Sequence, residues 1–208
     1  MKTLLLIQTS MFEGNGQSSQ LANRFTRQWL VANPGGQVIV RDVGRDPVPH
    51  LTAERFQAFL AKPEERTAEQ QSVAAYSDAL IDELRRADTI VLGLPMYNFG
   101  VPSSLKSYFD HVARAGVTFR YTERGPVGLL QGKEAFVFAT RGGVYAGTPA
   151  DTQTQFVRAF LAFIGIEDVE FVYAEGMSMG DGPKEKSLSA AHGAIERLTA
   201  RREEALAA

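Results

Sequence analysis

The 208-residue chain has no cysteine, only three histidines and a nearly balanced set of charges. Without cysteine, disulfide frameworks, thiolate metal centres and cysteine nucleophiles are excluded. The histidines, His50, His111 and His192, do not share the spacing of metal ligands, so we predict no metal site. Lysine and arginine total 22 against 24 acidic residues, which gives a net charge of −2. Such a balance disfavours nucleic acid or an anionic membrane as partner.

Long hydrophobic runs are also lacking. No apolar run approaches the roughly 20 residues of a membrane span. The run that starts at Leu4 is too short for a signal peptide and ends in Gln8, Thr9 and Ser10 without a small-residue cleavage site, so we interpret it as a strand of a cytoplasmic protein. Aromatic residues, by contrast, are plentiful, with 13 Phe, 6 Tyr and 1 Trp. If the protein is an enzyme, we expect a cofactor rather than its own side chains to carry the chemistry.

Strand-like and helix-like runs alternate along the whole chain. Continuous apolar runs predict five buried strands, at Leu4–Gln8, Val38–Val40, Thr89–Leu94, Ala135–Ala139 and Val169–Tyr173. Apolar residues at helical spacing predict helices at Ser18–Val31, Gln71–Arg86, Ser103–Arg114, Thr152–Ile164 and Glu185–Ala200, and a short one at Ala53–Leu60. This order predicts a single α/β domain over residues 1–208, a doubly wound sandwich with a five-stranded parallel sheet. Its ligand should bind at the carboxyl ends of the strands.

The connection after the first predicted strand, residues 9–19, is rich in glycine, serine, asparagine and glutamine. It leads into a helix, whose unpaired N–H groups and partial positive charge suit a phosphate. Ser10, Ser18 and Ser19 add hydroxyl groups, and Gly16 allows close approach of the backbone. The same loop is also close to a dinucleotide-binding fingerprint, with Asp42 where a ribose-binding acid would stand, although the third glycine is missing. This loop alone leaves both interpretations open.

The connection after the third predicted strand favours a flat cofactor. It contains Met96, Tyr97, Asn98 and Phe99 in succession. Aromatic side chains at an exposed strand end need an apolar partner, and an asparagine offers a donor and an acceptor in one plane. That combination suits a heteroaromatic ring such as a flavin. After the fourth predicted strand, Gly142 and Gly143 can aim successive N–H groups at one acceptor, such as the N1 and C2-carbonyl edge of a flavin.

Three segments together carry a resemblance to a known family. They are Pro95–Phe99, Ala113–Glu123, and Arg141–Gly143 taken with Phe163–Ile166. In these segments, and through nearly the whole chain, the sequence resembles the FMN-dependent NADH:quinone oxidoreductases, also called FMN-dependent NADH-azoreductases. The resemblance implies a flavodoxin-like fold and a homodimer with one FMN per subunit near the interface.

The resemblance also implies which residues hold the cofactor. The FMN phosphate would lie on Ser10, Gly16, Gln17 and Ser18. The isoalloxazine would lie on Met96, Tyr97, Asn98 and Phe99 and on Thr140, Arg141, Gly142 and Gly143. The family often has serine where this chain has Gly16, so we expect somewhat weaker phosphate binding. Thr140 likewise stands where serine is frequent.

The reaction implied by the resemblance is a ping-pong transfer of two electrons from NADH to quinones, and the reductive cleavage of aromatic azo compounds to amines. No side chain of this chain is assigned a catalytic role, because water or the substrate can supply the protons. Phe99, Tyr121 and Phe163 are candidates for an aromatic slot that holds flat substrates, with a partner subunit contributing, and Tyr145 is expected to influence acceptor preference.

Three other functions share this architecture. A flavodoxin-type electron carrier is typically shorter and strongly acidic, unlike this chain. A signalling receiver domain needs an aspartate after the third strand, where Pro95 and Met96 stand. A flavin-free dehydrogenase is the third alternative, and a purified protein that binds NADH without colour would favour it.

Overall fold

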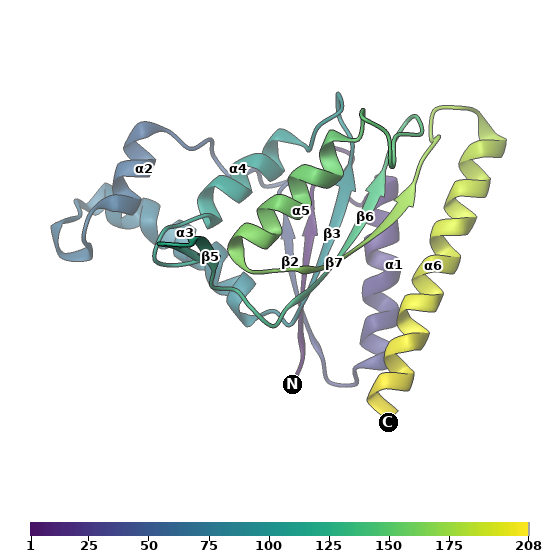
Figure 1. Cartoon of the computed structure of the whole chain (residues 1–208), viewed down its shortest axis with the longest axis horizontal. Coiled ribbons are helices and arrows are strands. Elements are labelled where there is room, and N and C mark those ends of the chain that lie inside the picture. Colours follow the sequence, from purple (N-terminus) through teal and green to yellow (C-terminus); the bar gives the residue numbers. More distant parts are fainter. Residues whose placement is uncertain (208) are drawn as a thin grey trace.

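The computed structural model describes residues 1–207, and it contains the predicted five-stranded parallel sheet. The strands lie in the order β2-β1-β3-β6-β7, and all four pairings are parallel. Their bounds are β1 Thr3–Gln8, β2 Gln37–Asp42, β3 Thr89–Pro95, β6 Glu134–Thr140 and β7 Asp168–Ala174. The prediction of a flavodoxin-like doubly wound sandwich is confirmed (Figure 1).

Helices cover both faces of this sheet. On one face lie α1 Gln17–Ala32 and α6 Asp181–Ala207, and on the other lie α3 Ala68–Arg86, α4 Ser103–Val112 and α5 Thr152–Ile164 (Figure 1). Alternate residues of β1 explain this sandwich, because side chains alternate between the two faces of a strand. Leu4 and Leu6 pack in the cluster with α1 and α6, whereas Leu5 and Ile7 pack in the cluster with α3, α4 and α5.

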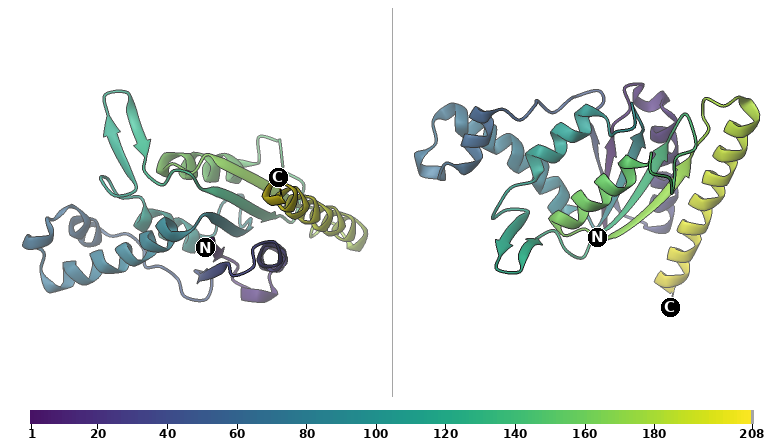
Figure 2. Two further views of the ribbon diagram at one scale, coloured as in Figure 1. Left: turned by 90° about the horizontal axis from the view of Figure 1, so that it is seen from below. Right: turned by 45° about the horizontal axis from the view of Figure 1, so that its top comes forward.

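Of the two long connections, one contains the helix predicted from the sequence and the other contains a hairpin that was not predicted. The connection 41–69 contains the predicted short helix, α2 Ala53–Leu60, and a 3-10 turn, η2 Pro63–Glu65. The connection 115–132 contains an antiparallel hairpin, β4 Phe119–Thr122 with β5 Gly125–Gly128, which the sequence analysis did not predict. This hairpin stands out from the body of the molecule in the left view of Figure 2. No helix in the described part of the chain is long and apolar enough to cross a membrane.

A glycine in the sheet decides how closely α1 can approach it. A Cβ added to Gly93 of β3 would lie 3.2 Å from the Ser18 carbonyl oxygen and 3.5 Å from the Ala22 Cβ. The first turn of α1 therefore packs directly on β3, and any side chain at 93 would push it away. This contact sets the start of α1 at the carboxyl edge of the sheet, where the candidate site lies.

Candidate functional site

Three loops meet at the carboxyl edge of the sheet, at the top of Figure 1. They follow β1, β3 and β6, and the direction of winding reverses between β1 and β3, where α/β sheets bind ligands. The Met11 N–H donates to the Tyr97 hydroxyl at 3.2 Å, and the Met96 N–H donates to the Thr140 carbonyl at 2.9 Å. The rings of Phe99 and Tyr145 pack edge to face with centroids 5.6 Å apart. The structure thus joins the three loops that the sequence singled out.

The loop after β1 ends in a helix start without a cap. A 3-10 turn, η1 Glu13–Asn15, precedes α1, and Gly16 stands at the cap position, where no side chain accepts from the first N–H groups. Ser18 lies inside the helix, so it is not the cap. Ser18 and Ser19 are both fully buried, and neither Oγ has a hydrogen-bond partner. Buried hydroxyls are normally satisfied, so this pair fits an anion held at the helix N-terminus.

The Ser10 side chain occupies the space that a side chain at position 16 would need. A Cβ added to Gly16 would lie 2.2 Å from the Ser10 Oγ, which accepts the Phe12 N–H at 3.2 Å. A side chain at 16 therefore requires Ser10 to move. Residues 9–19 contain no lysine or arginine, so any phosphate here is bound by neutral donors and the helix dipole. Gln17, at the first helical position, is half-buried.

The carboxylate of Asp42, at the end of β2, is engaged in its own turn. Its Oδ1 accepts the N–H groups of Gly44 and Arg45, both at 3.0 Å. An aspartate that hydrogen-bonds the following backbone stabilises a turn. This local role accounts for Asp42 without a ribose, and it removes one of the two observations that favoured the dinucleotide fingerprint.

The loop after β3 folds into a two-residue turn of unusual conformation. Tyr97 and Gly100 exchange both main-chain hydrogen bonds, at 3.1 and 3.0 Å. Between them Asn98 and Phe99 have φ of 49° and 66°, a left-handed pair in which Phe99 costs about 1–2 kcal/mol. The turn leaves Phe99 54% exposed beside Tyr145. Strained residues held by their surroundings cluster at functional sites, and this one presents an aromatic face at the strand edge.

The first turn of α5 holds this strained loop in place, which sequence reasoning missed. Gln153, buried in the protein, donates its Nε2 to the Pro95 carbonyl at 3.0 Å and to the Gly100 carbonyl at 3.2 Å. The Thr152 hydroxyl donates to the Phe99 carbonyl. Beside the turn a cavity of about 520 Å³ is lined by residues that include Val101, Gln153 and Phe156. No motif in the sequence marks Gln153, because its partners are carbonyls 53 and 58 residues away.

The loop after β6 presents a row of main-chain donors. Three successive carbonyls of this loop accept main-chain hydrogen bonds of 3.0 Å from the segment 176–178. The Arg141 carbonyl accepts the Met177 N–H, the Gly142 carbonyl accepts the Ser178 N–H, and the Gly143 carbonyl accepts the Gly176 N–H. In a planar trans peptide the N–H points opposite to the C=O, so the N–H groups of residues 142–144 point away from residues 176–178. Within the described residues none of these three N–H groups has an acceptor. Such successive donors form an anion-binding concavity.

Arg141 has its side chain turned into the protein. The guanidinium is fully buried, and it bridges Asp151 at 2.8 Å and Glu175 at 3.1 Å while stacking 4.9 Å over the Tyr173 ring. Burial alone raises the pKa of Asp151, but hydrogen bonds from Arg141 and Thr154 outweigh it and hold that pKa below its usual value. The Arg141 side chain therefore anchors the loop and does not line the edge of the site.

The remaining aromatic candidates lie elsewhere in the same chain. Tyr121 and Phe163 both pack on Phe119, with centroids 5.4 and 4.2 Å apart. Thr152 contacts Phe99, and Phe163 lies about 16 Å further along the axis of α5, at 1.5 Å per residue. One chain thus brings Phe99 together with Tyr145, and Tyr121 together with Phe163, but it does not unite the two pairs.

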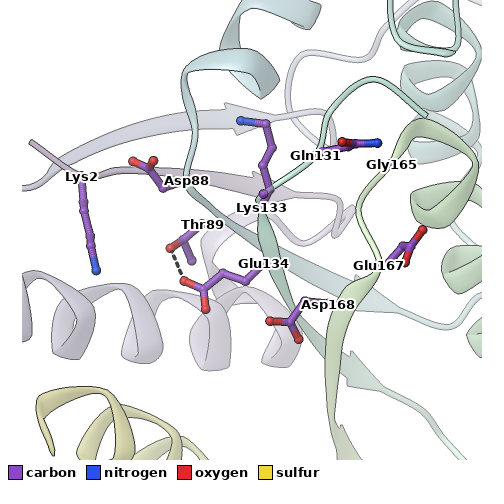
Figure 3. A pocket seen from close by; sticks show the side chains of 10 residues that line it. Lys2, Asp88, Thr89, Gln131, Lys133, Glu134, Gly165, Glu167 and Asp168 are labelled. Atoms are coloured by element: carbon purple, nitrogen blue, oxygen red, sulfur yellow. Dashed lines mark hydrogen bonds between the residues drawn. The ribbon is translucent and has the colours of Figure 1, made fainter. Parts of the chain in front are cut away.

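A second cavity, of about 660 Å³, lies at the opposite edge of the sheet (Figure 3). Lys2, Asp88 and Lys133 are among its lining residues, and its Thr89 donates to Glu134 at 2.7 Å. Since ligands of doubly wound sheets bind at the carboxyl ends of the strands, volume alone does not make it the site. No group of three histidine, aspartate or glutamate side chains within the described part of the chain is arranged to hold a metal ion.

The chain is similar to known proteins over nearly its whole length. A family model described as flavodoxin-like fold matches residues 1–198. An FMN-dependent NADH:quinone oxidoreductase of Cellvibrio japonicus (strain Ueda107) is 54% identical over 197 residues, which cover 95% of this chain and 98% of that protein. One from Alcanivorax borkumensis (strain ATCC 700651 / DSM 11573 / NCIMB 13689 / SK2) is 56% identical over 188 residues, 90% of this chain and 95% of that one.

The chain is also similar in structure to solved proteins over nearly its whole length. The azoreductase from Bacillus anthracis str. Sterne superposes with a TM-score of 0.86 at 26% identity, covering 98% of this chain and 100% of that one. An FMN-dependent NADH-azoreductase from Bacillus anthracis str. Ames Ancestor in complex with FMN superposes with a TM-score of 0.87 at 27% identity, covering 97% and 99%.

Proposed function

The chain belongs to the family of FMN-dependent NADH:quinone oxidoreductases with a flavodoxin-like fold, and we propose that it carries two electrons from NADH to quinones and cleaves aromatic azo compounds to amines. The observation that carries this proposal beyond the relatives' names is the uncapped start of α1 with two buried, unpaired serine hydroxyls. When bound, FMN supplies the redox chemistry, accepting a hydride from NADH and passing the electrons on. The proposal includes a cytoplasmic location, because NADH is an intracellular nucleotide.

The first part of the proposal assigns the phosphate of FMN to the start of α1. The hydroxyls of Ser10, Ser18 and Ser19 and the N–H group of Gln17 would hold it. The Gly16 N–H already donates to the Glu13 carbonyl at 3.2 Å, so Gly16 would contribute the close approach of its backbone. Their support is the fit of the chemistry: these donors are neutral, and the helix dipole adds partial positive charge where a phosphate needs it.

The second part assigns the ring system to the other two loops. Met96, Tyr97, Asn98 and Phe99 would pack on it, and the N–H groups of Gly142 and Gly143 would face its polar edge. Thr140 and Arg141 support that edge from below, since the Thr140 carbonyl accepts the Met96 N–H and the Arg141 side chain is anchored inside. Donors fixed in advance stabilise negative charge there without reorganising.

The third part is a homodimer that completes the substrate slot. Tyr121 is 74% exposed on a hairpin that projects from the body (Figure 2), and one chain leaves it far from Phe99. We propose that Tyr121 and Phe163 of the partner subunit close the slot over Phe99 and Tyr145. Flat acceptors and the nicotinamide ring would stack in this slot in turn, which makes the kinetics ping-pong, while water supplies the protons.

Steady-state kinetics and mixed dimers test this proposal. Double-reciprocal plots for NADH at several quinone concentrations should give parallel lines. A dimer of one Ser18→Ala subunit and one Tyr121→Ala subunit retains one intact slot if sites are shared. At limiting FMN the mixed dimer should therefore be more active than either homodimer. Intersecting lines contradict the ping-pong cycle, and mixed dimers no more active than their parents contradict the shared slot.

A further inference from the structure

Glu175 lies directly after β7 and gathers three donors on one carboxylate oxygen. Its Oε1 accepts the N–H groups of Tyr145 and Ala146, both at 2.9 Å, and an Arg141 guanidinium N–H at 3.1 Å. The Glu175 side chain is only 12% exposed. Its own N–H donates to the Ser187 Oγ at 2.8 Å, which ties the residue to α6. Glu175 thus clamps the far end of the loop that follows β6.

Arg141 clamps the near end of the same loop. Besides its pairs with Asp151 and Glu175, its N–H donates to the Ala174 carbonyl at 3.0 Å, and its guanidinium donates to the Thr154 hydroxyl at 2.9 Å. The two ends of the loop are therefore joined by one buried ion pair, Arg141 with Glu175. Each partner is also held from elsewhere, Arg141 by Asp151 and Glu175 by two main-chain N–H groups, so the pair is fixed in one arrangement.

What lies between the two clamps is the row of free donors. The N–H groups of residues 142–144 keep a common direction only while their carbonyl partners, on residues 176–178, stay in register with the loop. Glu175 is the residue next to that segment and also holds Tyr145. A shift of the Glu175 carboxylate would move both the loop after β6 and the segment 176–178, and it would therefore change the direction of the N–H groups of residues 142–144.

We propose that Glu175, acting through Arg141 and the loop, is a positioning residue that sets the redox potential of bound FMN. This inference rests on the proposed function, because it needs FMN beside the loop after β6. Main-chain donors aimed at the N1 and C2-carbonyl edge favour the reduced cofactor, which gains negative charge there. Glu175 itself touches neither cofactor nor substrate.

Two substitutions separate position from charge. Glu175→Asp keeps the charge and withdraws the carboxylate by one methylene, whereas Glu175→Gln keeps the length and an acceptor oxygen without the charge. The midpoint potential and the dissociation constant of FMN are measured for each. We expect Glu175→Asp to weaken FMN binding at least tenfold and to lower the preference for reduced FMN about tenfold, which is about 30 mV for two electrons. Glu175→Gln should stay within threefold in both quantities.

Glu196→Asp is the matched control, because Glu196 forms an exposed pair with Arg24 on the surface. It should change neither quantity. If Glu175→Asp does not fold, Ser187→Ala replaces it, since losing the hydroxyl that accepts the Glu175 N–H should shift the potential in the same direction at least threefold. The inference is overturned if the folded variant matches the unaltered protein, or if only Glu175→Gln shifts the potential. If the unaltered protein binds no FMN, the proposed function fails instead.

Discussion

Replacing Ser18 by alanine should make the apoprotein more stable and its cofactor binding weaker. The Ser18 Oγ is buried without a partner, and a buried unsatisfied polar group costs about 1–3 kcal/mol. Alanine removes that cost and leaves only a small void, so the free energy of unfolding of the apoprotein should rise by about 1 kcal/mol. The same hydroxyl would donate to a phosphate, a charge-assisted bond of about 1.5–3 kcal/mol. Its loss should raise the dissociation constant of FMN about 10- to 100-fold.

Ser77→Ala is the matched control for this experiment. Ser77 is also a fully buried helical serine, but its Oγ donates to the His111 carbonyl at 2.6 Å and accepts from Arg114 at 3.2 Å. Its replacement should lower the unfolding free energy by about 1–3 kcal/mol and leave the FMN dissociation constant unchanged. Urea unfolding of apoprotein and fluorescence titration with FMN measure the two effects. If Ser18→Ala also destabilises the apoprotein and binds FMN normally, the hydroxyl is not held in reserve for a phosphate.

Three further predictions follow from the loops and the core. Gln153→Ala should lower the free energy of unfolding by about 1–3 kcal/mol and raise the FMN dissociation constant, because the Pro95 carbonyl at the end of β3 and the Gly100 carbonyl of the strained turn lose their donor. Urea unfolding unchanged from that of the original protein would contradict this. Phe99→Gly should leave the free energy of unfolding in urea nearly unchanged, because relief of about 1–2 kcal/mol of left-handed backbone strain offsets the cost of glycine's flexibility, about 0.5–1 kcal/mol. The same change should raise KM for flat quinones. A large loss of stability would show that Phe99 is not strained. Burial lowers the pKa of His111, so the folded state takes up its proton less readily than the unfolded chain, and stability should fall below about pH 6.5 by up to about 1.4 kcal/mol per pH unit. His111→Asn, compared with His192→Asn, should flatten urea stability measured between pH 7.5 and 5, and an unaltered slope would count against it.

The lowered pKa of His111 has a physical cause in its burial and in the unpartnered Nε2 of its ring. Its Nδ1 donates to the Ser107 carbonyl at 3.0 Å, and its buried Nε2 has no partner. A proton on Nε2 would create a second donor with no acceptor, which disfavours the charged form. Asparagine keeps a donor near the position of Nδ1, so His111→Asn removes the titration while preserving that hydrogen bond.

The fold was predictable because its strands and helices follow from short-range patterns of apolar residues. The five apolar runs and the apolar helical faces require only local periodicity, and the sheet order follows from a few winding rules. The hairpin β4–β5 was not predictable in the same way. Its strands have four residues each, Pro126 and two glycines interrupt the second, and only Phe119 is buried. Such a segment carries no alternating pattern.

The site was predictable in its loops but not in its supports. Gly142 and Gly143 stand out in the sequence, yet the direction of their N–H groups depends on hydrogen bonds with residues more than 30 positions away. Asn98 and Phe99 form a left-handed turn without the glycine that usually signals one, because α5 holds it through Thr152 and Gln153. Contacts of this kind appear only once the chain is folded.

The absorption spectrum of the purified protein, recorded before and after anaerobic addition of NADH, tests together whether FMN is bound and whether NADH reduces it. We expect a yellow, FMN-loaded protein whose flavin absorbance disappears at once on adding NADH and returns on adding a quinone. A colourless protein that binds NADH, or an FMN-loaded protein that NADH leaves unchanged, as an electron carrier would be, contradicts it.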